Sequence, residues 1–238
     1  MRIRQLHEWD LSVEEAIETQ RRLADRIRVP APSKRKIRRI AAGDISYDRG
    51  SDRIWAAIVV FSYPEIEQLE IALHTCRVHF PYIPGLLSFR EAPPLLDGLA
   101  QLVTQPDVLL LDAHGLAHPR RFGLACHIGL LASLPSIGCA KSLLVGEHAR
   151  LGSRRGSTTP IYYNRRKIGI ALRTRNRVRP VYVSCGYKMR LSEALAIIHT
   201  CTGPFRIPTP LRAAHNLANR ARQMGSIHIE KVTSGLIT

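Results

Sequence analysis

Three acidic residues in this chain lie within or next to apolar segments. Asp44 lies in the run Ala-Ala-Gly-Asp-Ile-Ser-Tyr at 41–47, although strands disfavour Asp. Asp112 follows the apolar run 108–111, and Glu91 ends a proline-bracketed segment at 81–91. Carboxylates that separate segments deliver to one end of a sheet can hold a hard cation such as Mg²⁺. Such a cation polarises phosphorus, lowers the pKa of the attacking water and stabilises the leaving oxyanion.

The segment 81–91 reads Pro-Tyr-Ile-Pro-Gly-Leu-Leu-Ser-Phe-Arg-Glu, so two prolines stand beside an aromatic ring that can enter a stacked polymer. Lys and Arg total 35 against 19 Asp and Glu, a net charge of +16, which favours polyanionic partners. Basic density is highest at 34–39 and 154–179, and both runs flank predicted strands and so can rim a cleft. The three acids, the aromatic ring between two prolines and the basic charge together predict metal-dependent chemistry on a nucleic acid.

Two further residues are candidates for the same site. Lys141 interrupts the apolar run Gly-Cys-Ala-Lys-Ser-Leu-Leu at 138–144, where its amine either faces the acids or reaches past a sheet edge to solvent. His215 lies early in a predicted helix that follows Ile-Pro-Thr-Pro at 207–210, and it is either catalytic or a packing residue. An acid-rich set of ligands favours Mg²⁺ or Mn²⁺ over zinc.

Length and composition predict one domain with a sizeable core, because 45% of the 238 residues are hydrophobic. The five cysteines are odd in number and show no Cys-x-x-Cys spacing, so we expect reduced thiols, with neither a disulfide framework nor a structural zinc. Residues 1–10 contain no apolar signal region, and no apolar run approaches the roughly 20 residues of a membrane span. The expected location is therefore the cytoplasm.

The elements that would position these residues follow from the sequence pattern. Ser12 and Glu15 form a capping box, which predicts a helix that ends before Pro30. The segments 37–47, 54–63 and 66–80 are expected to form an antiparallel meander. Pro93 and Pro94 suit a first helical turn. Further on, the pattern predicts strands 108–111, 137–145 and 181–185, helices 122–134, from 192 and 210–223, and a hairpin around 167–173. Alternation of strands and helices indicates an α/β protein with parallel strands.

Three segments of the sequence resemble endonuclease V, the deoxyinosine-directed repair nuclease. They are 81–91, Asp-Ala-His-Gly-Leu-Ala-His-Pro-Arg at 112–120 and Gly-Cys-Ala-Lys at 138–141, and the correspondence runs from the first strand to the helix with His215. The resemblance implies an RNase H-like mixed sheet flanked by helices, spanning residues 1–238. It implies Asp44 and Asp112 as metal ligands for Mg²⁺, with Mn²⁺ able to substitute. It also implies that Glu91 completes the metal site directly or through water, and that Lys141 and His215 are accessory catalytic residues.

The resemblance also assigns roles to the wedge and to a base pocket. Tyr82 would fill the space of an extruded base, within a wedge made of Pro81, Tyr82, Ile83 and Pro84. Hypoxanthine would be held by Gly85, Leu87, Ala113, Gly115 and Leu124. A weak inosine pair costs less to open than a normal pair, which fits extrusion of the base. The family usually has glycine where this chain has Ala113, and an added methyl changes pocket fit by only about 1–3 kcal/mol.

The expected function is that of a monomeric endonuclease that cuts the second phosphodiester bond 3′ to deoxyinosine, and acts on other deaminated bases in DNA. It would leave 3′-hydroxyl and 5′-phosphate ends. Two alternatives stay open. One is cleavage of inosine-containing RNA, since the 2′-hydroxyl is what a protein can use to tell the two substrates apart. The other is a non-catalytic nucleic-acid-binding protein, against which the three retained acids argue.

Overall fold

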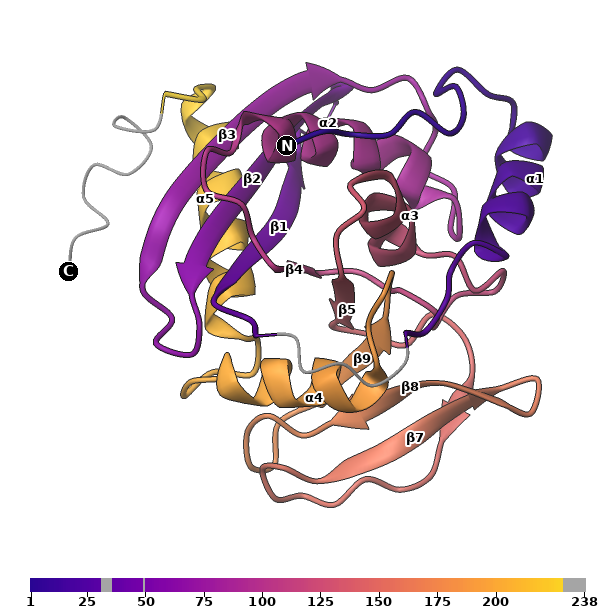
Figure 1. Ribbon diagram of the computed structural model, residues 1–238, viewed down its shortest axis with the longest axis vertical. Coiled ribbons are helices and arrows are strands. Elements are labelled where there is room, and N and C mark those ends of the chain that lie inside the picture. Colours follow the sequence, from indigo (N-terminus) through magenta and orange to yellow (C-terminus); the bar gives the residue numbers. More distant parts are fainter. Residues whose placement is uncertain (31–35, 49, 229–238) are drawn as a thin grey trace.

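The computed structural model describes residues 1–30, 36–48 and 50–228, so Lys34 and Arg35 of the first basic run lie outside the described residues. Its centre is a nine-stranded mixed sheet with the order β3-β2-β1-β4-β5-β9-β8-β7-β6 (Figure 1). The strands are β1 Arg39–Tyr47, β2 Arg53–Ser62, β3 Gln68–Arg77, β4 Val108–Leu111, β5 Ser136–Ala140, β6 Glu147–His148, β7 Thr158–Tyr163, β8 Arg166–Leu172 and β9 Val181–Cys185. The helices are α1 Val13–Ala24, α2 Leu87–Gln101, α3 Leu124–Leu131, α4 Leu191–Thr200 and α5 Thr209–Met224.

The sheet has a parallel centre between two antiparallel ends. Strands β1, β2 and β3 form the predicted antiparallel meander. Strands β4 and β5 then add in parallel to β1, as the alternation of strands and helices predicted. Strand β9 returns antiparallel to β5, and β8, β7 and β6 extend the sheet from there. The α/β class is confirmed, and this mixed sheet with flanking helices has the RNase H-like arrangement.

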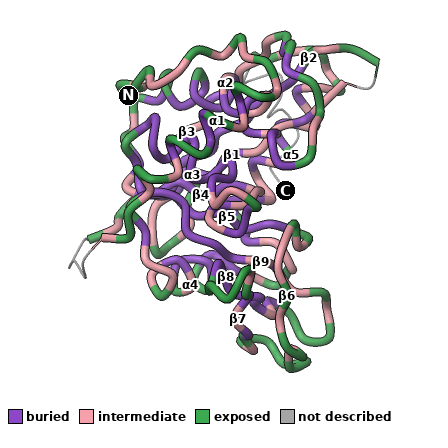
Figure 2. Tube along the Cα trace, turned by 90° about the vertical axis from the view of Figure 1, so that its right-hand side faces the viewer, coloured by how far each residue is buried: buried purple, intermediate pink, exposed green. Residues whose placement is uncertain are grey.

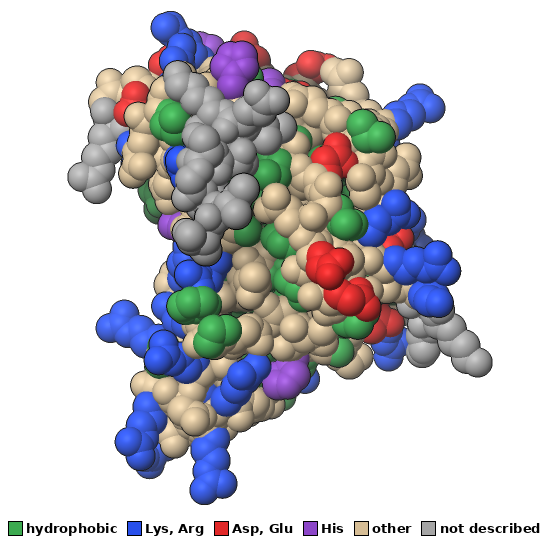
Figure 3. Space-filling model, turned by 90° about the vertical axis from the view of Figure 1, so that its left-hand side faces the viewer, with side chains coloured by type: hydrophobic (Ala, Val, Ile, Leu, Met, Phe, Trp, Pro, Cys, Tyr) green, Lys and Arg blue, Asp and Glu red, His purple; other side chains and the backbone are tan. Residues whose placement is uncertain are grey.

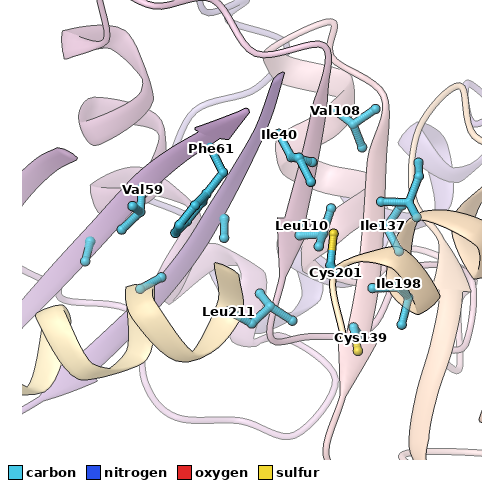
Figure 4. Close-up of a cluster of buried hydrophobic side chains, with 14 of the residues drawn as sticks. Ile40, Val59, Phe61, Val108, Leu110, Ile137, Cys139, Ile198, Cys201 and Leu211 are labelled. Atoms are coloured by element: carbon cyan, nitrogen blue, oxygen red, sulfur yellow. The ribbon is translucent and has the colours of Figure 1, made fainter. Parts of the chain in front are cut away.

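Helices cover both faces of the sheet because successive strand residues point to opposite faces. On one face α5 packs on β1 and β2, and α4 packs on β9. The core there joins Ile40 and Leu110 of the strands to Ile198 and Leu211 of the helices (Figure 4). On the other face α2 and α3 pack on the sheet, around a core that includes Ala41. Buried residues follow the central strands in Figure 2, and each buried aliphatic side chain contributes about 1.5–3 kcal/mol.

Several boundaries differ from the sequence prediction, and two of these differences affect the residues discussed below. Helix α2 begins at Leu87, so Pro93 and Pro94 lie inside it and not in its first turn. The helix continues through them because its apolar face, which includes Phe89 and Leu95, stays buried along the whole length. Strand β5 ends at Ala140, five residues earlier than predicted. Lys141 therefore follows the strand and does not interrupt it.

Other predictions are confirmed. Ser12 caps α1: its hydroxyl accepts a hydrogen bond from the Glu15 amide at 3.2 Å, and the Glu15 carboxylate accepts one from the Ser12 amide at 2.8 Å. All five cysteines are free thiols. Among the described helices, none combines the length and the apolar character that crossing a membrane requires.

Candidate active site

The register of the parallel strands brings two of the predicted acids together. Gly43 of β1 pairs with Leu111 of β4, and Leu111 pairs with Gly138 of β5. Asp44 directly follows Gly43 in β1, and Asp112 directly follows Leu111 at the end of β4. Neighbouring strands are about 4.8 Å apart, so the two aspartates begin close together. A cavity of about 470 Å³ opens at this point. Its walls include eleven of the predicted residues: Asp44, Tyr82, Pro84, Gly85, Leu87, Glu91, Asp112, Ala113, Leu124, Lys141 and His215.

Asp44, Asp112 and His215 form the tightest group of potential metal ligands in the described part of the chain. One ligand atom from each lies within 4.8 Å of the others. Asp112 is also paired with the Lys141 ammonium. Burial and then the charge of Asp44 raise the pKa of Asp112, because two carboxylates repel each other in a poorly solvated place. A divalent cation between them would relieve that repulsion, and carboxylate oxygens are the ligands that Mg²⁺ and Mn²⁺ prefer. The donor set therefore fits such a metal.

Glu91 enters the cavity from helix α2 and not from the end of a strand. It is not a member of the group formed by the two aspartates and His215. Its Oε1 accepts a hydrogen bond from the Tyr47 hydroxyl. Burial raises the pKa of Glu91 to about 7, and the charges of Asp44 and Asp112 act in the same direction. Burial and the Glu91 carboxylate likewise raise the pKa of Tyr47 above its usual value, so this phenol stays protonated and acts as a donor.

The segment predicted as a wedge projects from the cavity rim. Tyr82 is 66% exposed, which is unusual for so large an apolar ring. Several side chains hold the turn that follows Tyr82 by hydrogen bonds to a single atom, the carbonyl oxygen of Gly85. This oxygen accepts hydrogen bonds from His118 Nε2 at 2.9 Å, Arg120 Nη2 at 2.7 Å and Gln20 Nε2 at 3.0 Å. Burial lowers the pKa of His118 to about 3, so the ring is neutral and donates through Nε2.

The remaining wedge and pocket residues do not line the cavity. Ile83 packs inward against the cluster that contains Phe80, whereas Pro81 is exposed. Gly115 lies behind the cavity wall and does not line it. Its amide donates to Ser184 Oγ at 2.8 Å, and a Cβ at this position would lie 2.0 Å from the carbonyl oxygen of Cys185. Glycine is thus required at 115 by the close approach of β9.

Sequence reasoning did not single out several residues that support the site. Tyr47 follows Asp44 on the same strand, and only the packing of α2 reveals its contact with Glu91. Gln20 comes from α1, far away along the chain. Asn219 was the easiest of them to find, because it lies four residues after His215 and therefore on the same face of a helix.

A strongly basic region adjoins the cavity. We call residues 147–179, which include β6, β7 and β8, the basic arm. No Asp or Glu occurs between Glu147 and Glu193. Figure 3 shows Lys and Arg side chains gathered over the lower part of the molecule, where β7 and β8 lie. The loop 141–146, which leaves the cavity, packs against the arm through contacts of Leu143 and Val145 with the cluster of Ile161 and Ile168.

Comparisons with known proteins agree with this geometry. The sequence profile of the family described as Endonuclease V matches residues 21–216. Endonuclease V of Roseiflexus castenholzii is 45% identical over 216 residues, which cover 91% of this chain and 96% of that protein. The crystal structure of Endonuclease V from Streptomyces avermitilis has a TM-score of 0.87 and 37% identity, covering 94% of this chain and 99% of that one.

A more distant structure was solved with nucleic acid. It is Endonuclease V of Ciona intestinalis in complex with a 24mer DNA that contains an inosine followed by a ribo-adenosine. Its TM-score is 0.78 at 26% identity, and the match covers 90% of this chain and 99% of that one. With the profile match over residues 21–216 and relatives of 45% identity, this chain belongs to the Endonuclease V family.

Proposed function

We propose that this chain is a divalent-metal-dependent endonuclease that recognises deoxyinosine, and other deaminated bases, in DNA. It acts as a monomer and cuts the second phosphodiester bond 3′ to the lesion, leaving 3′-hydroxyl and 5′-phosphate ends. Mg²⁺ is the metal, and Mn²⁺ substitutes for it. Asp44 and Asp112 are the proposed ligands, with Glu91 completing the site directly or through water.

The observation that carries this proposal is the continuity of one cavity. Its apolar wall contains Leu87, Ala113 and Leu124, a surface suited to an unstacked base. The same cavity is lined by Asp44 and Asp112, where a metal would meet a phosphate. A base held by the apolar residues therefore keeps the backbone of the same nucleic-acid strand within reach of the two carboxylates.

Each residue has a task that follows from its contacts. When bound, the metal supplies electrophilic activation of the phosphate and of water. Asp44 and Asp112 present carboxylate oxygens to it, and Lys141 orients the Asp112 carboxylate through their ion pair. Tyr47 holds the Glu91 carboxyl against the cavity wall. Tyr82, exposed at the rim, fills the gap that an extruded base leaves in the stack.

Cleavage of inosine-containing RNA is the second candidate. The Ciona intestinalis protein was crystallised with a ribo-adenosine directly after the inosine, so a ribose at this position deserves a direct test. The comparison needs matched oligonucleotides that carry a ribose or a deoxyribose at the nucleotide directly after the inosine, because only the 2′-hydroxyl differs between them.

The test is metal-dependent nicking of an end-labelled duplex with a single deoxyinosine. The wild-type chain, Asp112→Asn and the control Asp97→Asn are assayed with Mg²⁺, with Mn²⁺ and with chelator. Asp97 is a suitable control because it is on α2 with its side chain 60% exposed. We expect one nick, one nucleotide beyond the lesion, from the wild type and from Asp97→Asn, and none from Asp112→Asn.

Three outcomes would change the proposal. Equal nicking by Asp112→Asn would remove this carboxylate from the metal site. Nicking of the ribose substrate alone would make the chain an endoribonuclease. Lesion binding without a cut under either metal would leave a binding protein that has no turnover.

A further inference from the structure

A chain of four hydrogen bonds runs from Arg222 to Asp44. Arg222 Nε donates to Ser46 Oγ at 2.9 Å, and Ser46 Oγ donates to Asn219 Oδ1 at 2.8 Å. Asn219 Nδ2 lies 3.0 Å from His215 Nε2, and His215 Nδ1 lies 2.7 Å from Asp44 Oδ2. The chain therefore begins three helical residues beyond Asn219 and ends on a proposed metal ligand.

With a neutral imidazole ring, the two ends of this hydrogen-bond chain allow one direction of donation. A guanidinium has no acceptor, so Arg222 must donate, and the Ser46 hydroxyl proton is then free for Asn219 Oδ1. The Asn219 amide accordingly turns its NH₂ group toward His215, which makes Nε2 of that ring an acceptor. The ring proton then resides on Nδ1, where it donates to Asp44.

For the neutral ring, the opposite orientation of the Asn219 amide is unfavourable at both ends. Ser46 Oγ would receive two donors, and its own proton would have no partner within the chain. His215 would carry its proton on Nε2 and would turn the lone pair of Nδ1 toward the Asp44 carboxylate at 2.7 Å. Two acceptors at this distance repel each other, so the first orientation is the consistent one.

The spacing of the two elements explains why the chain can form. His215, Asn219 and Arg222 are at positions i, i+4 and i+7 of α5, which is one face of a helix. Asp44 and Ser46 are at i and i+2 of β1, which is one face of a strand. Four helical residues rise about 6.0 Å and two strand residues about 6.7 Å, so the two rows stay in step.

We propose that Asn219, supported by Ser46 and Arg222, is a positioning residue that holds His215 in its Nδ1–H tautomer as a donor to Asp44. Both ring nitrogens are then engaged, so His215 orients the carboxylate and does not ligate the metal. The backbone amide of Ile45 fixes the other oxygen, Asp44 Oδ1, at 2.9 Å. Each oxygen of Asp44 keeps a lone pair, and the carboxylate is turned toward the cavity before any metal arrives. The inference rests on the proposed nuclease function.

The first test detects the His215 tautomer directly by NMR and does not depend on nuclease activity. The intact protein is labelled at histidine, its imidazole carbon and nitrogen NMR signals are recorded with chelator, and the His215 signal is identified by its loss in His215→Gln. We expect the Nδ1–H pattern in the wild type. Asn219→Asp removes the donor without changing the shape, so we expect the signal to move to the Nε2–H or doubly protonated pattern.

The matched control is Asn216→Asp, the same change on the same helix at an exposed position. We expect it to keep the wild-type tautomer and rate. For Asn219→Asp we expect kcat to fall by about 10–100-fold, the usual effect of losing the hydrogen-bond support of a metal ligand, because His215 would no longer hold Asp44; KM for the inosine duplex should be nearly unchanged. Ser46→Ala, which breaks the chain one step further out, should give a smaller change in both readouts.

Several results would overturn the inference. They are an Nε2–H or doubly protonated pattern for His215 in the wild type, or identical behaviour of Asn219→Asp and Asn216→Asp. Thermal unfolding of each variant shows whether it folds normally. If Asn219→Asp has a folding defect, the wild-type tautomer and the Ser46→Ala variant test the inference instead. If the wild type nicks no inosine substrate while the tautomer is as expected, the proposed function fails and the positioning inference does not.

Discussion

Glu91 illustrates how a single buried carboxyl group links stability to pH. Its pKa of about 7 in the folded chain is above the ordinary value of 4.5, so the folded state holds a proton that the unfolded state has lost. Its contribution to stability is complete below pH 4.5 and is lost as the pH rises through 7. In the metal-free protein, Glu91 is therefore destabilising at alkaline pH.

We predict that Glu91→Gln stabilises the metal-free protein above pH 7 and has little effect near pH 4.5. The expected gain in the free energy of unfolding at pH 8 is about 1–3 kcal/mol, since one pKa unit corresponds to about 1.4 kcal/mol. Urea unfolding in chelator at both pH values measures it. Glu65→Gln, at an exposed position, is the control. A gain that is equal at the two pH values would contradict the assigned pKa.

The exposed ring of Tyr82 leads to a second prediction at the scale of single residues. Tyr82→Ala should weaken binding to the inosine duplex by about 1–3 kcal/mol, the usual contribution of one aromatic ring stacked on a base. Affinity is measured in the Asp112→Asn background, so that the DNA stays intact. Tyr82→Phe keeps the ring and should bind as the wild type does. Equal affinity of all three proteins would exclude a stacking role for this residue.

At the scale of elements, the turn before α2 depends on Gly85. Its φ of +84° is unfavourable for other residues, and an added Cβ would lie 3.1 Å from Arg120 Nη2. Gly156 has a similar φ of +87° with nothing within 4 Å. We predict that both glycine-to-alanine variants lose about 1–2 kcal/mol of stability from backbone strain. Gly85→Ala alone should also raise KM for the inosine duplex, which steady-state nicking measures. An equal KM in the two variants would exclude a role for this turn in substrate capture.

Local sequence signals located most elements, but they could not locate contacts made across the fold. Strands β4 and β9 have the bounds predicted from their short apolar runs, and the Ser12 cap fixes the start of α1. The start of α2 was missed because two prolines usually open a helix, whereas tertiary burial holds this one together through them. The cavity gathers the five predicted polar residues, yet the hydrogen bond of Tyr47 to Glu91 depends on how α2 meets β1, and no local pattern records that.

For the whole molecule, the charge distribution predicts how binding depends on salt. Arg166 and Lys167 are exposed on the basic arm. If each contacts one phosphate, replacing both with glutamine should reduce the slope of log affinity against log salt by about 2, uniformly for damaged and undamaged DNA. The matched control replaces Arg53 and Arg77, exposed partners on β2 and β3 at the other end of the sheet. A larger effect of the control pair would place the duplex on that side.

The pairing of Asp44 with His215 joins residues that are 171 positions apart. Helix α5, which provides the histidine, packs on β1 and β2 from the first third of the chain. During synthesis, a nascent chain that has reached Pro208 already contains all three acids but lacks the helix that orients the first of them. The site would therefore gain its full activity only after α5 has been synthesised and has packed on β1, so that a nascent polypeptide without this helix would be a poor catalyst of strand breaks.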